Sequence, residues 1–171
     1  MKRKILLGLL VLVGLFMITG CGTDPKTEIN GIEEQKKQSN LKIGNVSVDL
    51  NRSASFHDIS YKYPENAISG NMGTFAIMDL MDGEKLAVRI AMYFYENKAM
   101  GAINAGAGLS SVDVIRYNNN TWNVYKGVKD GKQVMNYATQ EGDNSYTITF
   151  LSDYDIEEFS DVFMKTVFFN R

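Results

Sequence analysis

Four short runs of strand-forming residues follow one another in the second half of the chain, with tight-turn signals between them. The turn signals are Asn118-Asn119-Asn120, Asp130-Gly131 and Gly142-Asp143-Asn144, whose residue types tolerate left-handed backbone. Connections this short allow only antiparallel pairing of consecutive strands. The pattern therefore predicts an antiparallel meander, with strands at Val112 to Tyr117, Thr121 to Val128, Val134 to Thr139, and Tyr146 to Phe150.

Alternating apolar residues also predict strands in the first half. Val46, Val48 and Leu50 form one such pattern, and Ile59, Tyr61 and Tyr63 form another that ends at Pro64. Asn66 to Gly73 is predicted to be a loop. Asp82-Gly83 predicts a hairpin between a strand from Phe75 to about Leu80 and the longest strand, Leu86 to Tyr95. The longest strand is apolar on one face and nearly so on the other, which predicts a central position with both faces covered.

Two segments have helical spacing. Glu96 to about Ala107 is one, although Gly101, Gly106 and Gly108 weaken it; these small residues would let the helix lie close to the sheet. Ser152 and Asp155 form a candidate capping box for a closing helix. That helix would present an apolar stripe and precede a short strand at Val167 to Phe169; the stripe comprises Ile156, Phe159, Val162 and Phe163.

The N-terminus combines a basic start with a short apolar run. Lys2, Arg3 and Lys4 precede Ile5 to Ile18, which is shorter than the about 20 residues that a membrane-spanning helix needs. The run ends in Ile18-Thr19-Gly20-Cys21. This segment resembles a bacterial lipoprotein signal peptide with its lipobox. The resemblance implies that Cys21 receives diacylglycerol and becomes the acylated first residue of the mature protein.

Three segments are therefore predicted: a signal peptide at 1–20, the lipidated Cys21 with a flexible tether through 42, and one globular domain at 43–171. The tether is polar and has few apolar residues that would order it. Lipid anchoring places the domain on the extracytoplasmic face of a bacterial membrane. Because Gly22 follows the cysteine, the Gram-negative inner-membrane retention signal is missing, and we favour a Gram-positive membrane.

Charge and cysteine content make several classes of function less favourable. The chain has a formal charge of -2, and removal of Lys2, Arg3 and Lys4 leaves about -5. Such a balance disfavours nucleic-acid binding, which needs a basic surface. Cys21 is the only cysteine. Lipidation would consume it, so no disulfide, thiol nucleophile or thiolate metal site is expected.

Three stretches of the chain support a resemblance to a known fold group. They are "ISYKYPEN", "NNNTWNVYKGVKDGKQVMNYATQEGDNSYTITF" and "DIEEFSDVFMKTVFF". From Phe56 to Phe169 the order of expected elements resembles the PsbP/Mog1-like group. The resemblance implies an α+β fold in which an antiparallel sheet carries helices on both faces, an α/β/α sandwich. Members of this group are mostly binding or accessory proteins.

Catalytic motifs are not evident. His57 is the only histidine, no G-x-S-x-G elbow accompanies it, and a packing or surface role is the simpler interpretation. Asp79, Asp82 and Glu84 surround one hairpin, where solvated carboxylates are common. Four further carboxylates could bind a hard cation such as calcium, but stabilisation of a helix N-terminus already accounts for them: Asp153, Asp155, Glu157 and Glu158. We expect no metal and no cofactor.

Aromatic residues on the meander provide a possible binding surface for sugar rings or a partner protein. These residues are Trp122, Tyr125, Tyr137 and Tyr146. The same residues would equally serve as core beneath a helix, which is the interpretation we favour.

The leading hypothesis is a non-enzymatic, membrane-anchored binding or accessory module with an unidentified envelope protein or ligand as partner. Two alternatives stay open. One is an envelope-polymer hydrolase that uses loop carboxylates, and the other is a carrier or sensor of a small ligand.

Overall fold

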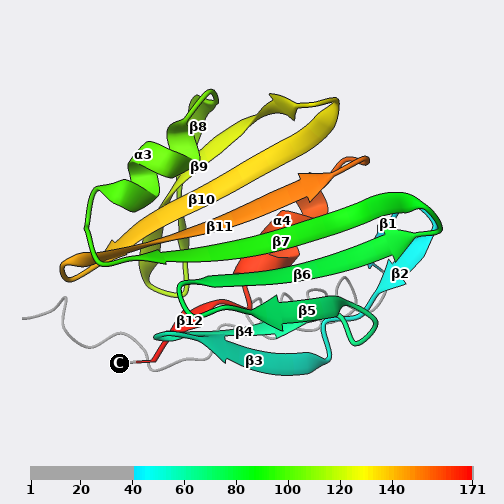
Figure 1. Cartoon of the computed structure of the whole chain (residues 1–171), viewed down its shortest axis with the longest axis horizontal. Coiled ribbons are helices and arrows are strands. Elements are labelled where there is room, and N and C mark those ends of the chain that lie inside the picture. Colours follow the sequence, from blue (N-terminus) through cyan, green and yellow to red (C-terminus); the bar gives the residue numbers. More distant parts are fainter. Residues whose placement is uncertain (1–40, 171) are drawn as a thin grey trace, which may run out of the picture. The chain divides into compact units, whose positions relative to one another are not determined.

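The computed structural model describes residues 41–170, and most of these form antiparallel sheet. The signal peptide predicted at 1–20 and nearly all of the predicted tether lie outside the described residues. The main sheet has seven strands in the order β5-β6-β7-β11-β10-β9-β8 (Figure 1). Its strands are β5 (Ile68–Asn71), β6 (Phe75–Asp82), β7 (Lys85–Tyr95), β8 (Ser110–Tyr117), β9 (Asn120–Lys129), β10 (Lys132–Glu141) and β11 (Asn144–Ser152).

Two smaller sheets and two helices complete the described part of the chain. β1 (Leu41–Ile43) pairs with β2 (Val46–Val48), and a three-stranded sheet has the order β12-β4-β3, with β3 at Arg52–Phe56, β4 at Ile59–Tyr63 and β12 at Phe168–Phe169. The helices are α3 (Met100–Gly106) and α4 (Glu157–Met164). The fold is thus mixed α+β, dominated by antiparallel sheet. None of the helices within residues 41–170 is both long enough and apolar enough to cross a membrane.

The core lies between the main sheet and the three-stranded sheet, with α4 packed into it. Phe163 of α4 contacts the Phe150 ring on β11, with centroids 5.4 Å apart, and the Tyr61 ring on β4 at 6.0 Å. α3 lies on the opposite face of the main sheet (Figure 1). Residues of α4 that point into the core are nearly inaccessible because their side chains follow one face of the helix: Phe159, Val162, Phe163 and Met164.

The meander is confirmed, and its turns have the expected backbone. Asn118 and Asn119 have φ of 47° and 69°, and Asp130 and Gly131 have φ of 52° and 78°. β7 is an interior strand, as predicted, between β6 and β11, although β11 holds the middle position of the sheet.

Several element boundaries differ from the predictions. The domain includes Leu41 and Lys42, assigned to the tether, because Leu41 is buried in β1. The predicted loop at Asn66 to Gly73 contains β5, an exposed edge strand, and β3 was not predicted at all. Both strands lack strong alternation, and β3 contains only one fully buried residue, Phe56. The first helix spans Met100–Gly106 and is shorter than the predicted segment from Glu96 to Ala107.

The capping box predicted at Ser152 and Asp155 is wrong. Ser152 is the last residue of β11, and its hydroxyl donates to the Ala87 carbonyl and accepts a bond from the Tyr154 amide. α4 begins at Glu157, with Glu157 and Glu158 in its first turn, and Asp155 Oδ1 accepts a bond of 2.9 Å from the Glu157 amide. Strand pairing with Gln133 of β10 and the side-chain bond to β7 therefore outcompeted the local helix-start signal at Ser152.

Candidate functional site

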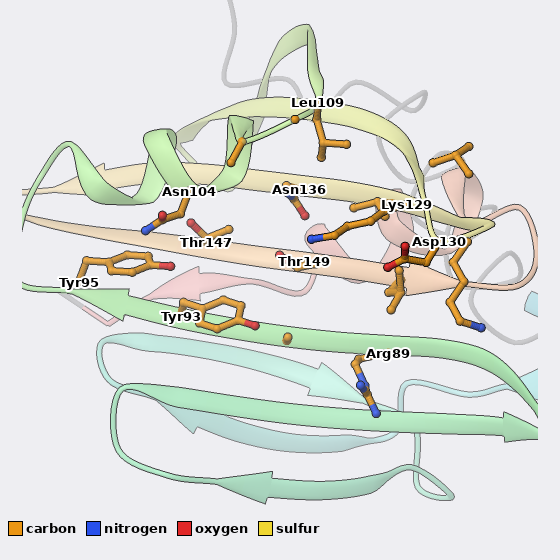
Figure 2. A pocket seen from close by; sticks show the side chains of 17 residues that line it. Arg89, Tyr93, Tyr95, Asn104, Leu109, Lys129, Asp130, Asn136, Thr147 and Thr149 are labelled. Carbon is orange, nitrogen blue, oxygen red and sulfur yellow. The ribbon is translucent and has the colours of Figure 1, made fainter.

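A cavity of about 760 Å³ opens on the face of the main sheet that carries α3. Its floor is formed by β7, β10 and β11, and its walls by α3, by the loop at 107–109 that follows the helix, and by the β9–β10 hairpin (Figure 2). The cavity exists because α3 has only 7 residues and covers only part of this face. A volume of this size is typical of sites for small ligands.

Strand register explains the chemical character of the floor. Val134, Leu151 and Arg89 lie opposite one another across β10, β11 and β7. Two residues further along, Asn136 lies opposite Thr149, and Thr149 lies opposite Ala91. Side chains of residues opposite one another share a face of the sheet. The floor therefore has one row in which Val134 and Leu151 lie beside Arg89, and a second row in which Asn136 and Thr149 lie beside Ala91.

Polar side chains of the sheet hold α3 in place. Ser145 Oγ accepts a bond of 2.9 Å from the Gly101 amide and donates one of 2.5 Å to the Asn97 carbonyl. Thr147 Oγ1 donates to the Gly101 carbonyl at 3.0 Å. A Cβ on Gly101 would lie 2.9 Å from Ser145 Cβ, so only glycine permits this approach. The expectation that small residues let this helix lie close to the sheet is confirmed.

Asn136 has a buried acceptor beside the cavity. Its Nδ2 donates a 2.7 Å bond to the Ala105 carbonyl of α3, and the residue is only 8% exposed. Its Oδ1 is buried and has no hydrogen-bond partner within the described part of the chain. Figure 2 shows this side chain over the floor, with its nitrogen toward the helix and its oxygen toward the sheet. An unpaired buried acceptor favours a donor group, from a ligand or from water, at this point.

Three basic residues line the cavity, and two of them form ion pairs with carboxylates. Arg89 makes a two-bond pair with Asp79, with distances of 2.7 Å from Nε to Oδ1 and 2.6 Å from Nη2 to Oδ2. Lys132 pairs with Asp153. The Lys132 ammonium, together with the Leu86 amide, holds the pKa of the Asp153 carboxyl below its ordinary value. Lys129, the third, has no ion pair with any residue from 41 to 170.

Two tyrosines of β7 bound the cavity on the side away from β9. The Tyr93 and Tyr95 rings are stacked, with centroids 6.4 Å apart and planes 15° apart, and Tyr93 also packs against Phe75 at 5.0 Å. Burial raises the pKa of the Tyr95 hydroxyl, while a hydrogen bond with Asn104 opposes the shift. These residues provide an aromatic wall with polar tips.

The binding surface predicted from meander aromatics is not present as such. Trp122, Tyr137 and Tyr146 are each 1% exposed and belong to the core on the other face of the sheet, in line with the core interpretation favoured from the sequence. Trp122 packs near Phe169, and Tyr137 packs against Phe150. Tyr125 alone is partly exposed, and its ring lies beside Gly106 of α3. Alternation within each strand had placed these residues together, but it did not indicate which face was core.

The other sequence candidates have structural roles. His57 is exposed, stacks on Phe94 with ring centroids 3.9 Å apart, and bonds through Nε2 to the Gly73 carbonyl at 3.0 Å. Asp79 pairs with Arg89, and Asp82 accepts bonds from Asn45 and Tyr154. Across residues 41–170, no three acidic or histidine side chains are close enough together to hold a metal ion.

Sequence reasoning missed Arg89, Lys129, Asn136 and Thr149 as residues of one site. The available signal was the second face of the strands, where polar residues interrupt apolar runs: Asn136 in β10, and Thr147 and Thr149 in β11. Only the order of strands brings these positions to one cavity.

No protein-family model matches this chain, and no curated protein matches it. Among solved structures, the chain is similar to one from Bacteroides thetaiotaomicron VPI-5482 determined at 1.50 Å resolution. The two are 10% identical with a TM-score of 0.47, and the match covers 69% of this chain and 47% of the other. The chain thus spans about half the length of that structure. So distant a likeness supports no functional inference.

Proposed function

We propose that the protein is a lipid-anchored, non-enzymatic binding module on the extracytoplasmic face of a bacterial membrane, and that it takes its ligand into the cavity beside α3. The observation that carries the binding role is the half-covered face of the sheet. It leaves a cavity of about 760 Å³ where aliphatic, aromatic and polar side chains converge. That combination is characteristic of small-ligand sites.

The anchoring part of the proposal depends on the N-terminal residues. Cys21 ends a lipobox-like segment behind a basic and apolar start, and a diacylglycerol group there would give two acyl chains, enough for stable attachment. The polar stretch after Cys21 would act as a spacer between membrane and domain. The finer parts of this proposal are a Gram-positive membrane, supported by Gly22 directly after Cys21, and a PsbP/Mog1-like sandwich, supported by the sequence resemblance.

Lipidation is tested by expressing the chain in a Gram-positive host fed with a labelled fatty acid. The wild-type chain should incorporate label and begin at Cys21. Cys21→Ala should incorporate none and keep its signal peptide, visible as a larger mass. Thr23→Ala, two residues away, should behave as wild type. Label retained by Cys21→Ala would contradict the anchor.

Ligand binding is tested by mild purification of the full chain, solvent extraction and mass spectrometry of the small molecules released. Thr149→Trp would fill the cavity from its floor, since Thr149 is half-buried and lines it. We expect the variant to lose the species that the wild type carries. Asn123→Trp, an exposed β9 position outside the lining, is the matched control. Identical extracts from all three proteins would contradict binding in this cavity.

A further inference from the structure

The charges around the cavity distinguish between classes of ligand. Arg89 and Lys132 are paired with Asp79 and Asp153, which do not line the cavity. Among the residues that the structure describes, Lys129 is therefore the lining cation that forms no ion pair. Figure 2 shows the Lys129 side chain extending from the β9–β10 hairpin over the cavity and not out into solvent. A lysine placed in this way attracts an anionic group.

Asp130 limits how much negative charge the site accepts. It follows Lys129 in the turn, lines the same cavity and is exposed. No described cation forms an ion pair with it. A ligand with two negative charges would meet one available ammonium and one repelling carboxylate. A single negative charge fits this arrangement best.

The rest of the cavity suits an apolar body. Val134 and Leu151 lie side by side on the floor, and Leu109 and Val128 stand at the rim. Val128 is 63% exposed and is therefore available to contact a ligand. Leu109 approaches Gly127 so closely that a Cβ there would lie 2.6 Å from Leu109 Cδ2. Covering these side chains would remove apolar surface from water.

Hydrogen-bonding groups lie between the charge and the aromatic wall. Thr149 offers a hydroxyl to the cavity. Asn136, whose Oδ1 has no hydrogen-bond partner among the described residues, lies opposite Thr149 on β10. Tyr93 bounds the cavity on β7, three strands from β9. The lining therefore extends across four strands, which leaves room for an elongated small molecule.

We infer that the ligand is an amphipathic monocarboxylate, with its carboxylate at Lys129 and its apolar body over Val134 and Leu151. This inference rests on the proposed function and names the ligand class of the same cavity. Two sources share this chemistry: aliphatic acids released from lipids, and aryl-alkanoic acids from amino-acid breakdown.

The test is calorimetric titration of the full chain in phospholipid nanodiscs, with empty nanodiscs as the blank. The probes are octanoate and phenylpropionate, each compared with its alcohol, octanol or phenylpropanol. We expect each bound carboxylate to bind about fivefold more tightly than its alcohol, because the alcohol cannot form the charged contact. Preference for octanoate would indicate the lipid source, and preference for phenylpropionate the aromatic one; both support the inference.

Charge variants separate the ligand class from cavity binding in general. Lys129→Met should abolish the difference between carboxylate and alcohol without changing alcohol affinity. Asp130→Asn should tighten carboxylate binding about twofold by removing repulsion. Lys62→Met, an exposed position on β4 with the same charge change, should alter neither affinity.

Two results would overturn the inference. The first is equal affinity for acids and alcohols, both in the wild type and in Lys129→Met, which would show that the site does not recognise the charge. If Thr149→Trp still blocked binding of these probes, the cavity would nevertheless be their binding site. Failure of every probe to bind would also exclude this ligand class. The extraction experiment with Thr149→Trp decides separately whether the cavity binds anything, so failure of the ligand class and failure of the proposed function are distinguishable.

Discussion

Gly101 shows how a single missing side chain positions the candidate site. A Cβ there would lie 2.9 Å from Ser145 Cβ and 3.2 Å from the Tyr146 carbonyl oxygen. The latter is backbone of the central strand and has little freedom to move. Gly101 thereby sets how closely α3 approaches the sheet, and with it the height of the cavity wall.

Gly101→Ala should destabilise the protein. Alanine gains up to about 1 kcal/mol in helix propensity, but overpacking against a strand costs about 1–3 kcal/mol. We expect the free energy of unfolding, measured by urea titration, to fall by about 1 kcal/mol. Gly70→Ala in edge strand β5 is the control, because its Cβ would meet Ile77 Cγ2 at an ordinary 3.7 Å. Equal stability of the two variants would show that the helix tolerates displacement.

At the scale of elements, the β6–β7 hairpin is joined to the β1–β2 turn through one carboxylate. Asp82 Oδ2 accepts bonds from the Asn45 amide at 3.0 Å and from the Tyr154 hydroxyl at 2.7 Å. These contacts connect β1–β2, the main sheet and the segment before α4. The Asn45 backbone bond, followed by the Tyr154 hydroxyl, lowers the pKa of Asp82 below its ordinary 3.8.

This link should make stability depend on pH. A carboxyl whose folded pKa is depressed contributes its full stabilisation above the unfolded value and loses it as pH falls through the folded value. Asp82→Asn should therefore be less stable than wild type near neutral pH, and the gap should narrow as pH falls below about 4. Urea titrations across the acid range measure this, with the exposed Asp143→Asn as control. A gap that stays constant with pH would refute the link.

For the whole molecule, the folded domain begins earlier than sequence composition suggests. Leu41 and Ile43 of β1 are 5% and 1% exposed and belong to the same core as α4 and the main sheet. The chain therefore passes directly from the region of the predicted tether into a core strand. A force transmitted from the proposed membrane anchor would act on β1 first.

Ile43→Ala should cost about 2–4 kcal/mol, as expected for removing a buried aliphatic side chain. Lys42→Ala, the exposed neighbour on the same strand, should stay within about 0.5 kcal/mol of wild type. Thermal and urea denaturation of the full chain measure both. Similar stability of the two variants would show that β1 does not contribute to the core and belongs with the tether.

Sequence patterns determined much of the sheet. Alternation and turn chemistry located the four meander strands, and the positive φ values at Asn118, Asn119 and Asp130 agree with the turn assignments. Local rules succeeded here because a hairpin is formed by neighbours in the chain. They failed at β3 and β5, whose residues show little apolar–polar alternation. These two segments form strands because they pair with β4 and β6.

The candidate site was decided by tertiary structure alone. Alternation shows that Tyr137 and Asn136 point to opposite faces of β10, but it does not show which face meets α4 and which meets the shorter α3. That choice placed Tyr137 in the core and Asn136 beside the cavity. Burial depends on what packs against a face from elsewhere in the chain, and a periodic pattern within one strand carries no information about that partner.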